Sequence, residues 1–287
     1  MSARTSSALA AATTLLATLC ACAPQRHNTS FRGGDGAWRS SELWRDGKAE
    51  RCEYQASRVI YGAPRSYRAI AYTNVERYDA ATTTKSEGGG REVFKHHWSE
   101  IVPTENYDYR FSTCTYTDAA TLQAVKLTVG TQEDCGASFK QVWLAAGRWK
   151  FWDSVYFPGA GTRSGQLGVR EHLHFVDELT LLLRDCDFAA RAPLELELLP
   201  SQKTTRQAPF EPQLVRVEYV GEELLTLPIG AVATHHLRAD LGALRAEWWF
   251  AAESAAPWMN VLARYSDSAG VSYELSSMQR TAYWERP

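Results

Sequence analysis

The sequence predicts an all-β or β-dominated protein, built as an antiparallel meander that forms a curved sheet or half-barrel, with one short helix. Composition is the first observation: 10 Trp, 13 Tyr and 10 Phe stand against only 3 Met, which is typical of chains rich in strands. The second is a succession of short alternating segments separated by brief turn signals. Short connections favour antiparallel pairing, because parallel neighbours need crossovers of about a dozen residues or more.

Length and charge exclude several classes of protein. The chain has 287 residues, 45% of them hydrophobic and 22% charged, so collagen, coiled coil and wholesale disorder are excluded. The length fits one large domain or two small ones. Because 31 Lys and Arg are balanced by 33 Asp and Glu, we expect no nucleic-acid partner.

The first 21 residues are expected to be a signal peptide. An apolar run over 8–19 follows the single basic residue Arg4. The run has the length of a signal-peptide core and is too short to span a bilayer. No other apolar run approaches the roughly 18 residues of a transmembrane helix.

The end of that segment, Leu-Cys-Ala-Cys over 19–22, resembles the lipobox of bacterial lipoproteins. The resemblance implies that Cys22 becomes the lipidated N-terminus and that the lipid is the link to the membrane. The alternative is a plain secretory signal. Ala23 is not the Asp that retains many lipoproteins in the inner membrane. The implied location is therefore the outer membrane, with the protein facing the periplasm.

The remaining chain divides by composition. Residues 22–45 are polar and rich in Gly, Ser and Arg, and are expected to be a flexible tether. An N-terminal β lobe is predicted over 46–199, a Pro-bounded linker over 200–212, and a C-terminal β lobe over 213–287; one long curved sheet is the alternative to two lobes. The expected strands are 52–61, 67–72, 107–116, 122–129, 138–146, 149–157, 214–220, 231–237, 246–250, 261–265, 271–275 and 280–284.

Two segments illustrate the evidence for these elements. Val125, Leu127 and Val129 fall on one face of a strand and polar residues on the other, the period of two that a half-buried strand requires. Residues 176–184 (V-D-E-L-T-L-L-L-R) instead carry acids early and an arginine late, as a short helix prefers.

Four cysteines remain after Cys20 and Cys22 are set aside. An even number in an exported protein predicts at least one disulfide, with three possible connectivities. No C-x-x-C pair occurs, so neither a structural zinc site nor a thioredoxin-like motif is expected. The disulfide candidates are Cys52, Cys114, Cys135 and Cys186.

Metal and catalytic sites are not predicted. His172 and His174 would share a strand face near Asp177. Two histidines are fewer protein ligands than a zinc site usually has, and Asp177 is only a candidate third, so ordinary hydrogen-bonded histidines are the favoured interpretation. Ser164 lacks the G-x-S-x-G context of a nucleophile, and the glycines at 88–90 lack the lysine of a phosphate loop. We therefore expect no metal, no cofactor and no enzymatic activity.

Aromatic residues on both faces of two strands are the main functional signal. Trp149 and Phe151 oppose Trp152 and Tyr156 over 149–157, and Trp248 opposes Trp249. A second apolar face must be covered by the helix, by the other lobe, by a partner or by an apolar ligand. The hypothesis is a non-catalytic lipoprotein whose concave groove binds an apolar or lipid ligand; a structural or interaction protein and an unrecognised hydrolase are the alternatives. The groove residues are named as Trp152, Trp249 and Tyr156, with Arg163 or Arg170 near a head group.

Scattered short motifs resemble an uncharacterised family of exported bacterial proteins. In the first lobe they are 46–50, Arg58, 61–62, 107–113, 132–133 and 135–136; in the second, 227–231, 246–250 and 280–284 resemble a related domain of unknown function. The resemblance implies a curved sheet or half-barrel, broadly like lipoprotein-localisation factors, and a place in the cell envelope. It transfers no catalytic residue.

Overall fold

The computed structural model describes residues 34, 36–167, 172–253 and 257–285. The expected signal peptide over 1–21, the lipidation residue Cys22 and Arg170 lie outside the described residues.

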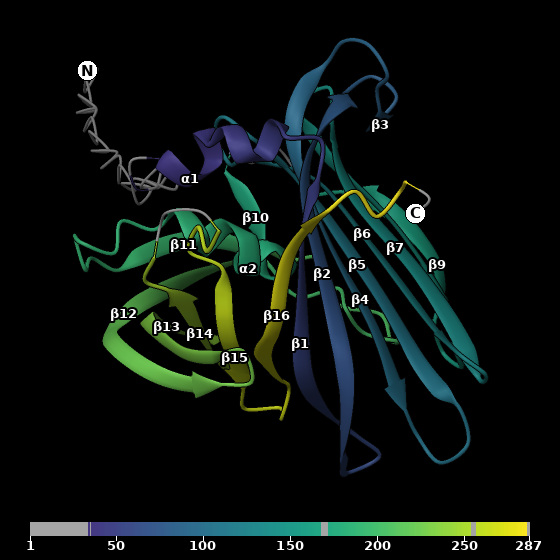
Figure 1. The fold of residues 1–287 in the computed structure, drawn as a ribbon. Coiled ribbons are helices and arrows are strands. Elements are labelled where there is room, and N and C mark those ends of the chain that lie inside the picture. Colours follow the sequence, from purple (N-terminus) through teal and green to yellow (C-terminus); the bar gives the residue numbers. More distant parts are fainter. Residues whose placement is uncertain (1–33, 35, 168–171, 254–256, 286–287) are drawn as a thin grey trace, which may run out of the picture.

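The strands join into one long, strongly curved sheet (Figure 1). Its order is β10-β11-β12-β13-β14-β15-β16-β1-β2-β4-β5-β6-β7-β8-β9, and β3 pairs with β2. The first wing holds β1 (Ala49–Ile60), β2 (Ala63–Asp79), β3 (Thr84–Lys85), β4 (Arg91–Pro103), β5 (Asp108–Asp118), β6 (Ala124–Glu133), β7 (Gly136–Ala145), β8 (Arg148–Tyr156) and β9 (Gly161–Gln166).

The second wing is formed by the rest of the chain. It holds β10 (Leu173–Phe175), β11 (Leu194–Leu199), β12 (Gln213–Leu227), β13 (Gly230–Leu241), β14 (Leu244–Ala251), β15 (Leu262–Asp267) and β16 (Ser272–Thr281). β16 pairs with β1 along nine residues, from Ala49 opposite Thr281 to Ser57 opposite Ser272. Of the two predicted arrangements, one continuous curved sheet is therefore the correct one.

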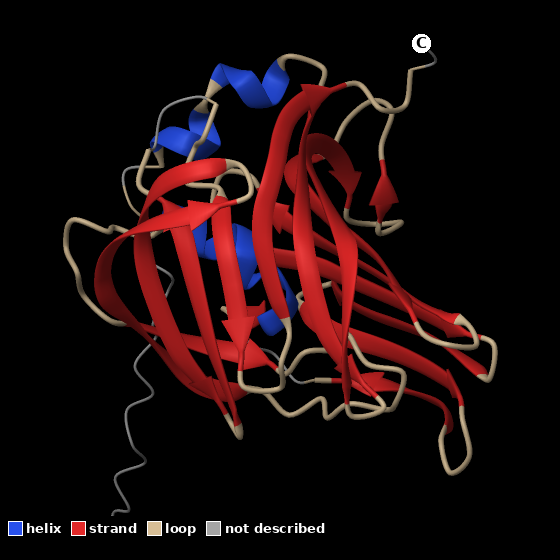
Figure 2. Ribbon diagram, turned by 60° about the horizontal axis from the view of Figure 1, so that its bottom comes forward, coloured by secondary structure: helices blue, strands red, loops and turns tan. Residues whose placement is uncertain are grey.

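The predicted helix lies inside the curve of the sheet, between the two wings (Figures 1 and 2). It comprises η2 (Val176–Glu178), α2 (Leu179–Leu182) and η3 (Leu183–Asp185), and we call this stretch the central helix. Leu179, Leu181 and Leu182 are buried in one cluster with residues of both wings. Because the helix fills the concave side, the inner face of the sheet is the core and the outer face meets solvent.

Connection length decides strand direction. All pairs are antiparallel except β10 with β11, whose crossover contains the central helix and is long enough for parallel pairing. β7 and β8 are joined by a hairpin that turns at Ala146 and Gly147, with φ of 49° and 71°. Two positive φ values in a two-residue loop match the right-handed twist of the flanking strands, and glycine adopts such values without strain.

The alternation seen in the sequence is confirmed in part. Leu127 and Val129 of β6 are buried in one cluster, whereas Val125 is buried in a separate cluster with Tyr78 and Val93, because the pairing of β5 with β6 shifts register beside it. β4 was absent from the predicted strands, because its inward-facing positions include His96 and Glu100, and both side chains are buried. Buried polar residues erase the period-two pattern on which the prediction depends.

The predicted tether 22–45 is wrong for its described C-terminal part. α1 (Ala37–Ser40) and η1 (Glu42–Arg45) lie there, and the side chains of Trp38 and Trp44 are buried. Both indoles pack against Phe94 of β4, at ring distances of 4.9 and 5.2 Å. Burial of two tryptophans is strongly favourable, and it docks this segment onto the core.

The predicted linker 200–212 is also ordered. It crosses the concave face of the first wing, and Gln202 and Phe210 are buried there. Phe210 stacks on Phe151 of β8 at 4.0 Å. We call residues 200–212 the strap.

The predicted disulfides are not formed, and the four candidate cysteines are free. Cys52 on β1 and Cys114 on β5 are separated by three strand spacings, about 14 Å in a sheet, which exceeds the span of a disulfide. Cys135 is exposed in the turn between β6 and β7, and Cys186 is buried just beyond the central helix.

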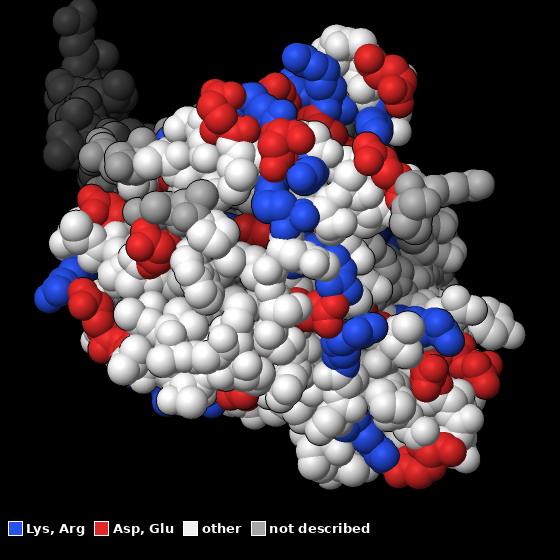
Figure 3. Space-filling view, viewed as in Figure 1, with Lys and Arg blue, Asp and Glu red and all other residues white. Residues whose placement is uncertain are grey.

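Charged residues lie mainly outside the curve. On the face shown in Figure 3, basic and acidic side chains alternate in a band over β1, β2 and β16. Arg51 and Arg68 both pair with Glu53, and Arg280 pairs with Asp46. Such a surface is solvated and has little net field.

Candidate functional site

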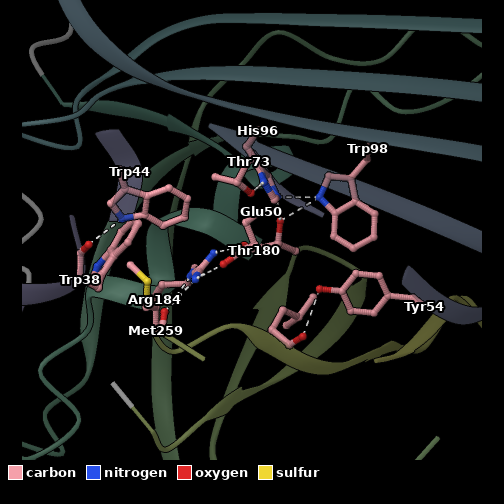
Figure 4. Close-up of polar contacts among 11 residues, drawn as sticks. Trp38, Trp44, Glu50, Tyr54, Thr73, His96, Trp98, Thr180, Arg184 and Met259 are labelled. Carbon is pink, nitrogen blue, oxygen red and sulfur yellow. Dashed lines mark hydrogen bonds and ion pairs between the residues drawn. The ribbon is translucent and has the colours of Figure 1, made fainter. Parts of the chain in front are cut away.

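A buried ion pair holds the central helix to the sheet (Figure 4). The Arg184 guanidinium donates to both carboxylate oxygens of Glu50 on β1, at 2.7 and 2.9 Å, and to the Met259 carbonyl at 3.1 and 2.8 Å. It also lies 5.1 and 5.6 Å from the rings of Trp38 and Trp44. Burial opposes the charge, but the Glu50 carboxylate keeps the pKa of Arg184 raised.

A neutral histidine forms a second attachment (Figure 4). Nε2 of His96 accepts the indole N–H of Trp98 at 2.7 Å and lies 3.0 Å from the Thr180 hydroxyl of the central helix. Nδ1 lies 2.8 Å from the Thr73 hydroxyl and carries the proton, because Nε2 is the acceptor. Burial lowers the pKa of His96 to about 3.

A cavity of about 460 Å³ opens beside these attachments, between the central helix, the strap and the strands of both wings. Most of its wall is apolar or aromatic, including Trp98, Trp248, Val176, Leu244 and Val271. We call it the first cavity. The other residues lining it are Arg58, Val59, Thr113, Asp177, Thr180, Ser201, Lys203, Thr204, Tyr265, Asp267, Ala269 and Tyr273.

Lys203 and Tyr273 in the wall of the first cavity belong to a hydrogen-bonded charge cluster around Glu100. Glu100 accepts from the hydroxyls of Tyr67 and Tyr273, at 2.6 and 2.7 Å, and from the Lys203 ammonium at 2.9 Å. Burial would raise the pKa of Glu100, but Lys203 and Arg58 lower it to about 2. Glu100 is therefore ionised at neutral pH. Burial and the neighbouring carboxylate raise the pKa of Tyr273 well above its ordinary value.

A second cavity of about 480 Å³ adjoins the first and shares Arg58, Val59, Lys203 and Thr204 with it. The Arg58 guanidinium lies 4.2 Å from the ring of Phe111, and that of Arg206 lies 3.4 Å from the ring of Phe157. Three tyrosine hydroxyls meet in its wall: Tyr61 bonds to Tyr107 at 2.9 Å and also to Tyr109. The remaining lining residues are Ile60, Glu133, Cys135 and Thr205.

The strap is fixed to the first wing by a buried lysine. The Lys140 ammonium donates to the carbonyls of Gln202, Thr204 and Arg206, at 3.0, 2.9 and 2.5 Å. Burial lowers the pKa of Lys140 to about 8. Since the ammonium carries three donors, this arrangement satisfies all of them and fixes the strap wall of both cavities.

The predicted groove residues of β8 lie on the wrong side of the sheet. The inner face carries Trp149, which is buried, whereas Trp152 is 37% and Tyr156 81% exposed on the outer face. Trp152 contacts Phe139 there, with ring centroids 5.7 Å apart. Alternation separates the two faces of a strand but does not say which is concave, and this choice was incorrect.

Trp249 is likewise on the outer face of β14, and Trp248 is the residue that lines the first cavity. Trp249 stacks on His236 at 4.2 Å, and its indole donates to Glu223 at 3.1 Å. Of the two arginines placed near a head group, Arg163 is bound elsewhere: it pairs with Asp153 at 2.8 Å and donates to the Ala208 carbonyl of the strap.

The histidines considered for a metal bond to different partners. His172 lies 3.3 Å from Gln123, whereas His174 bonds to Glu178 of the central helix at 2.5 Å. Within the described ranges, no three His, Cys, Asp or Glu side chains are grouped to hold a metal ion.

Sequence reasoning missed the residues that line both cavities. Arg58 and Lys203 lie on β1 and the strap, Glu100 behind them lies on β4, and no motif connects the three. Arg58 appeared only within the family resemblance. A charged residue inside a strand segment was the available signal, but it has the same appearance in sequence whether it faces solvent or the core.

No helix in the described part of the chain has both the length and the apolar character needed to cross a membrane.

Comparisons with known proteins identify the fold alone. No protein-family profile matches the sequence, and no curated protein matches it. One similar solved structure is a β-barrel-like protein of domain of unknown function DUF1849 from Brucella abortus, with a TM-score of 0.51 and 9% identity. The match covers 82% of this chain and 98% of that one. The curved, barrel-like sheet is thus shared with a protein of unknown function.

Proposed function

We propose that this protein is a non-catalytic lipoprotein of the cell envelope that binds an apolar or lipid ligand inside its half-barrel. The observation that carries the proposal is the first cavity, about 460 Å³ in volume and walled by Trp98, Trp248, Val176, Leu244 and Val271. That volume lies within the roughly 300–1,000 Å³ of small-molecule sites, and such sites are mostly apolar with a few placed polar groups.

The protonation states of Glu100 and of the tyrosines bonded to it support a binding role over catalysis at this cluster. A general acid or base works best with a pKa near the working pH. Glu100 has a pKa of about 2, and the tyrosines bonded to it have pKa values raised above the ordinary range. Lys140, with a pKa of about 8, is bonded to three carbonyls and is absent from the cavity wall.

Binding is tested with the neutral fluorescent probe N-phenyl-1-naphthylamine. We expect saturable binding, detected by increased probe emission and by energy transfer from Trp98 and Trp248. Val271→Trp places a larger side chain in the cavity. It is expected to lower the affinity for the probe about 10-fold or more, because the probe then loses apolar contact area. The matched control Val220→Trp, at a position 45% exposed, should bind as the wild type does. Absence of saturable binding to the wild type would refute the proposed function.

One observation favours a second candidate, an interaction lipoprotein without an internal ligand. Phe139, Trp152 and Tyr156 form an exposed aromatic group on the outer face of β7 and β8. Exposed aromatic groups of this kind occur at protein interfaces. Under this alternative, Trp152→Ala would abolish partner binding and leave the probe titration unchanged.

The envelope location rests on the Leu-Cys-Ala-Cys segment and is tested separately. Metabolic labelling with radioactive palmitate is expected to mark the wild type and Cys20→Ser, but not Cys22→Ser. An acylated Cys22 would partition the protein into membranes, since each buried CH₂ contributes about 0.8 kcal/mol. Equal labelling of all three proteins would contradict acylation at Cys22, whereas loss with Cys20→Ser alone would move the anchor to that residue.

A further inference from the structure

We propose that the second cavity binds the anionic head group, a carboxylate or phosphodiester, of an amphiphile whose apolar part occupies the first cavity. This inference rests on the proposed function and names the class of ligand. Adjacency is the first support. Arg58 and Lys203 line both cavities, so a single molecule that extends past them would reach both.

The distribution of charge assigns one end of the ligand to each cavity. In the first cavity Arg58 and Lys203 face Asp177 and Asp267, and the lining has no excess charge. In the second, Arg58, Lys203 and Arg206 face the single carboxylate of Glu133. Glu100 lies behind this wall and bonds to Lys203 at 2.9 Å. With Glu100 counted for both cavities, the formal charge is −1 around the first and +1 around the second, so a singly charged anion is favoured in the second.

Arg58 and Arg206 are the basic groups there that form no direct ion pair with any residue in the described part of the chain, and the buried Nε of Arg58 has no hydrogen-bond partner. The Glu100 carboxylate stabilises the charge of Arg58 from behind the wall, but it bonds directly to Lys203. A largely buried cation gains from a direct counter-charge. An anionic head group would supply that contact.

Two aromatic rings stack against these guanidinium groups and orient them. Phe111 and Phe157 lie against Arg58 and Arg206, at 4.2 and 3.4 Å. A stacked guanidinium keeps its N–H edge free, and that planar edge fits the two oxygens of a carboxylate or phosphodiester. The hydroxyls of Tyr61, Tyr107 and Tyr109 meet in the same wall and add donors.

The test compares two molecules with the same chain and different heads. Dodecanoate and 1-dodecanol are titrated against bound N-phenyl-1-naphthylamine near neutral pH. We expect dodecanoate to displace the probe about 10-fold more effectively, as charge-assisted hydrogen bonds require. Arg206→Gln replaces an arginine at an exposed position. In this variant the concentrations of dodecanoate and dodecanol that displace the probe are expected to differ by no more than about 2-fold. Arg216→Gln, an exposed arginine on β12, removes the same charge and should keep the preference.

Competition by inorganic phosphate tests whether the second cavity binds an anion by itself, without an attached chain. Inorganic phosphate is expected to compete with dodecanoate and not with the probe; competition with the probe would contradict two separate cavities. Equal displacement by dodecanoate and dodecanol in the wild type, or an unchanged preference in Arg206→Gln, would overturn the head-group site while ligand binding still stood. Failure of the probe to bind would instead overturn the proposed function.

Discussion

Replacing Glu50 with alanine is expected to lower the free energy of unfolding by about 3–5 kcal/mol. Arg184 is among the largest fully buried side chains, and Glu50 supplies its carboxylate partner. Removing the carboxylate leaves a cation deep in the core, with the Met259 carbonyl and two indole rings beside it but without its counter-charge. The loss is expected to loosen the central helix, because the ion pair connects it to β1.

Chemical denaturation followed by circular dichroism measures this effect, and two variants control it. Arg216→Ala, which breaks an exposed pair with Glu218, is expected to change the free energy by less than about 1 kcal/mol. The double variant Glu50→Leu with Arg184→Met removes both charges and is expected to recover much of the loss, because no unpaired charge remains. A Glu50→Ala variant as stable as the wild type would show that this ion pair does not hold the helix.

Acidification is expected to destabilise the folded protein in two steps, each from one buried group. The pKa of His96 is about 3 in the fold against an ordinary 6.5, so between these values the unfolded chain takes up a proton that the folded chain does not. Stability therefore falls as the pH drops below 6.5. The pKa of Glu100 is about 2 against an ordinary 4.5, so its stabilisation is present above pH 4.5 and is lost as the pH falls toward 2.

Both groups act in the same direction, and together they are expected to remove on the order of 5 kcal/mol between pH 6.5 and pH 3. Urea denaturation at a series of pH values measures the slope. His96→Gln is expected to flatten the curve from pH 6.5 down to about 3, and Glu100→Gln only below pH 4.5, so the interval from pH 6.5 to 4.5 separates the two variants. A wild-type curve that is level from pH 6.5 to 4.5 would mean that His96 is not held neutral.

The fold class could be predicted from the sequence, because strand alternation and the placement of charged residues along a helix are local properties. Val125, Leu127 and Val129 predicted β6, and the acids and arginine of 176–184 predicted the central helix. Local patterns failed where the core is polar: β4 was missed because His96 and Glu100 face inward. They also failed where a polar segment carries buried anchors, as with Trp38 and Trp44 before β1 and with Phe210 in the strap.

The sequence by itself determined that this chain builds antiparallel strands joined by short connections, one short helix and strands with two apolar faces. Only the tertiary structure decided which face is concave, so that Trp248 and not Trp249 lines the first cavity. It also decided which charges meet: Glu50 and Arg184 are 134 residues apart, and Glu100 and Lys203 are 103 apart. The physical reason is that alternation depends on residues that are neighbours in sequence. Curvature and charge pairing depend instead on how the helix and the strap pack against the concave face of the sheet.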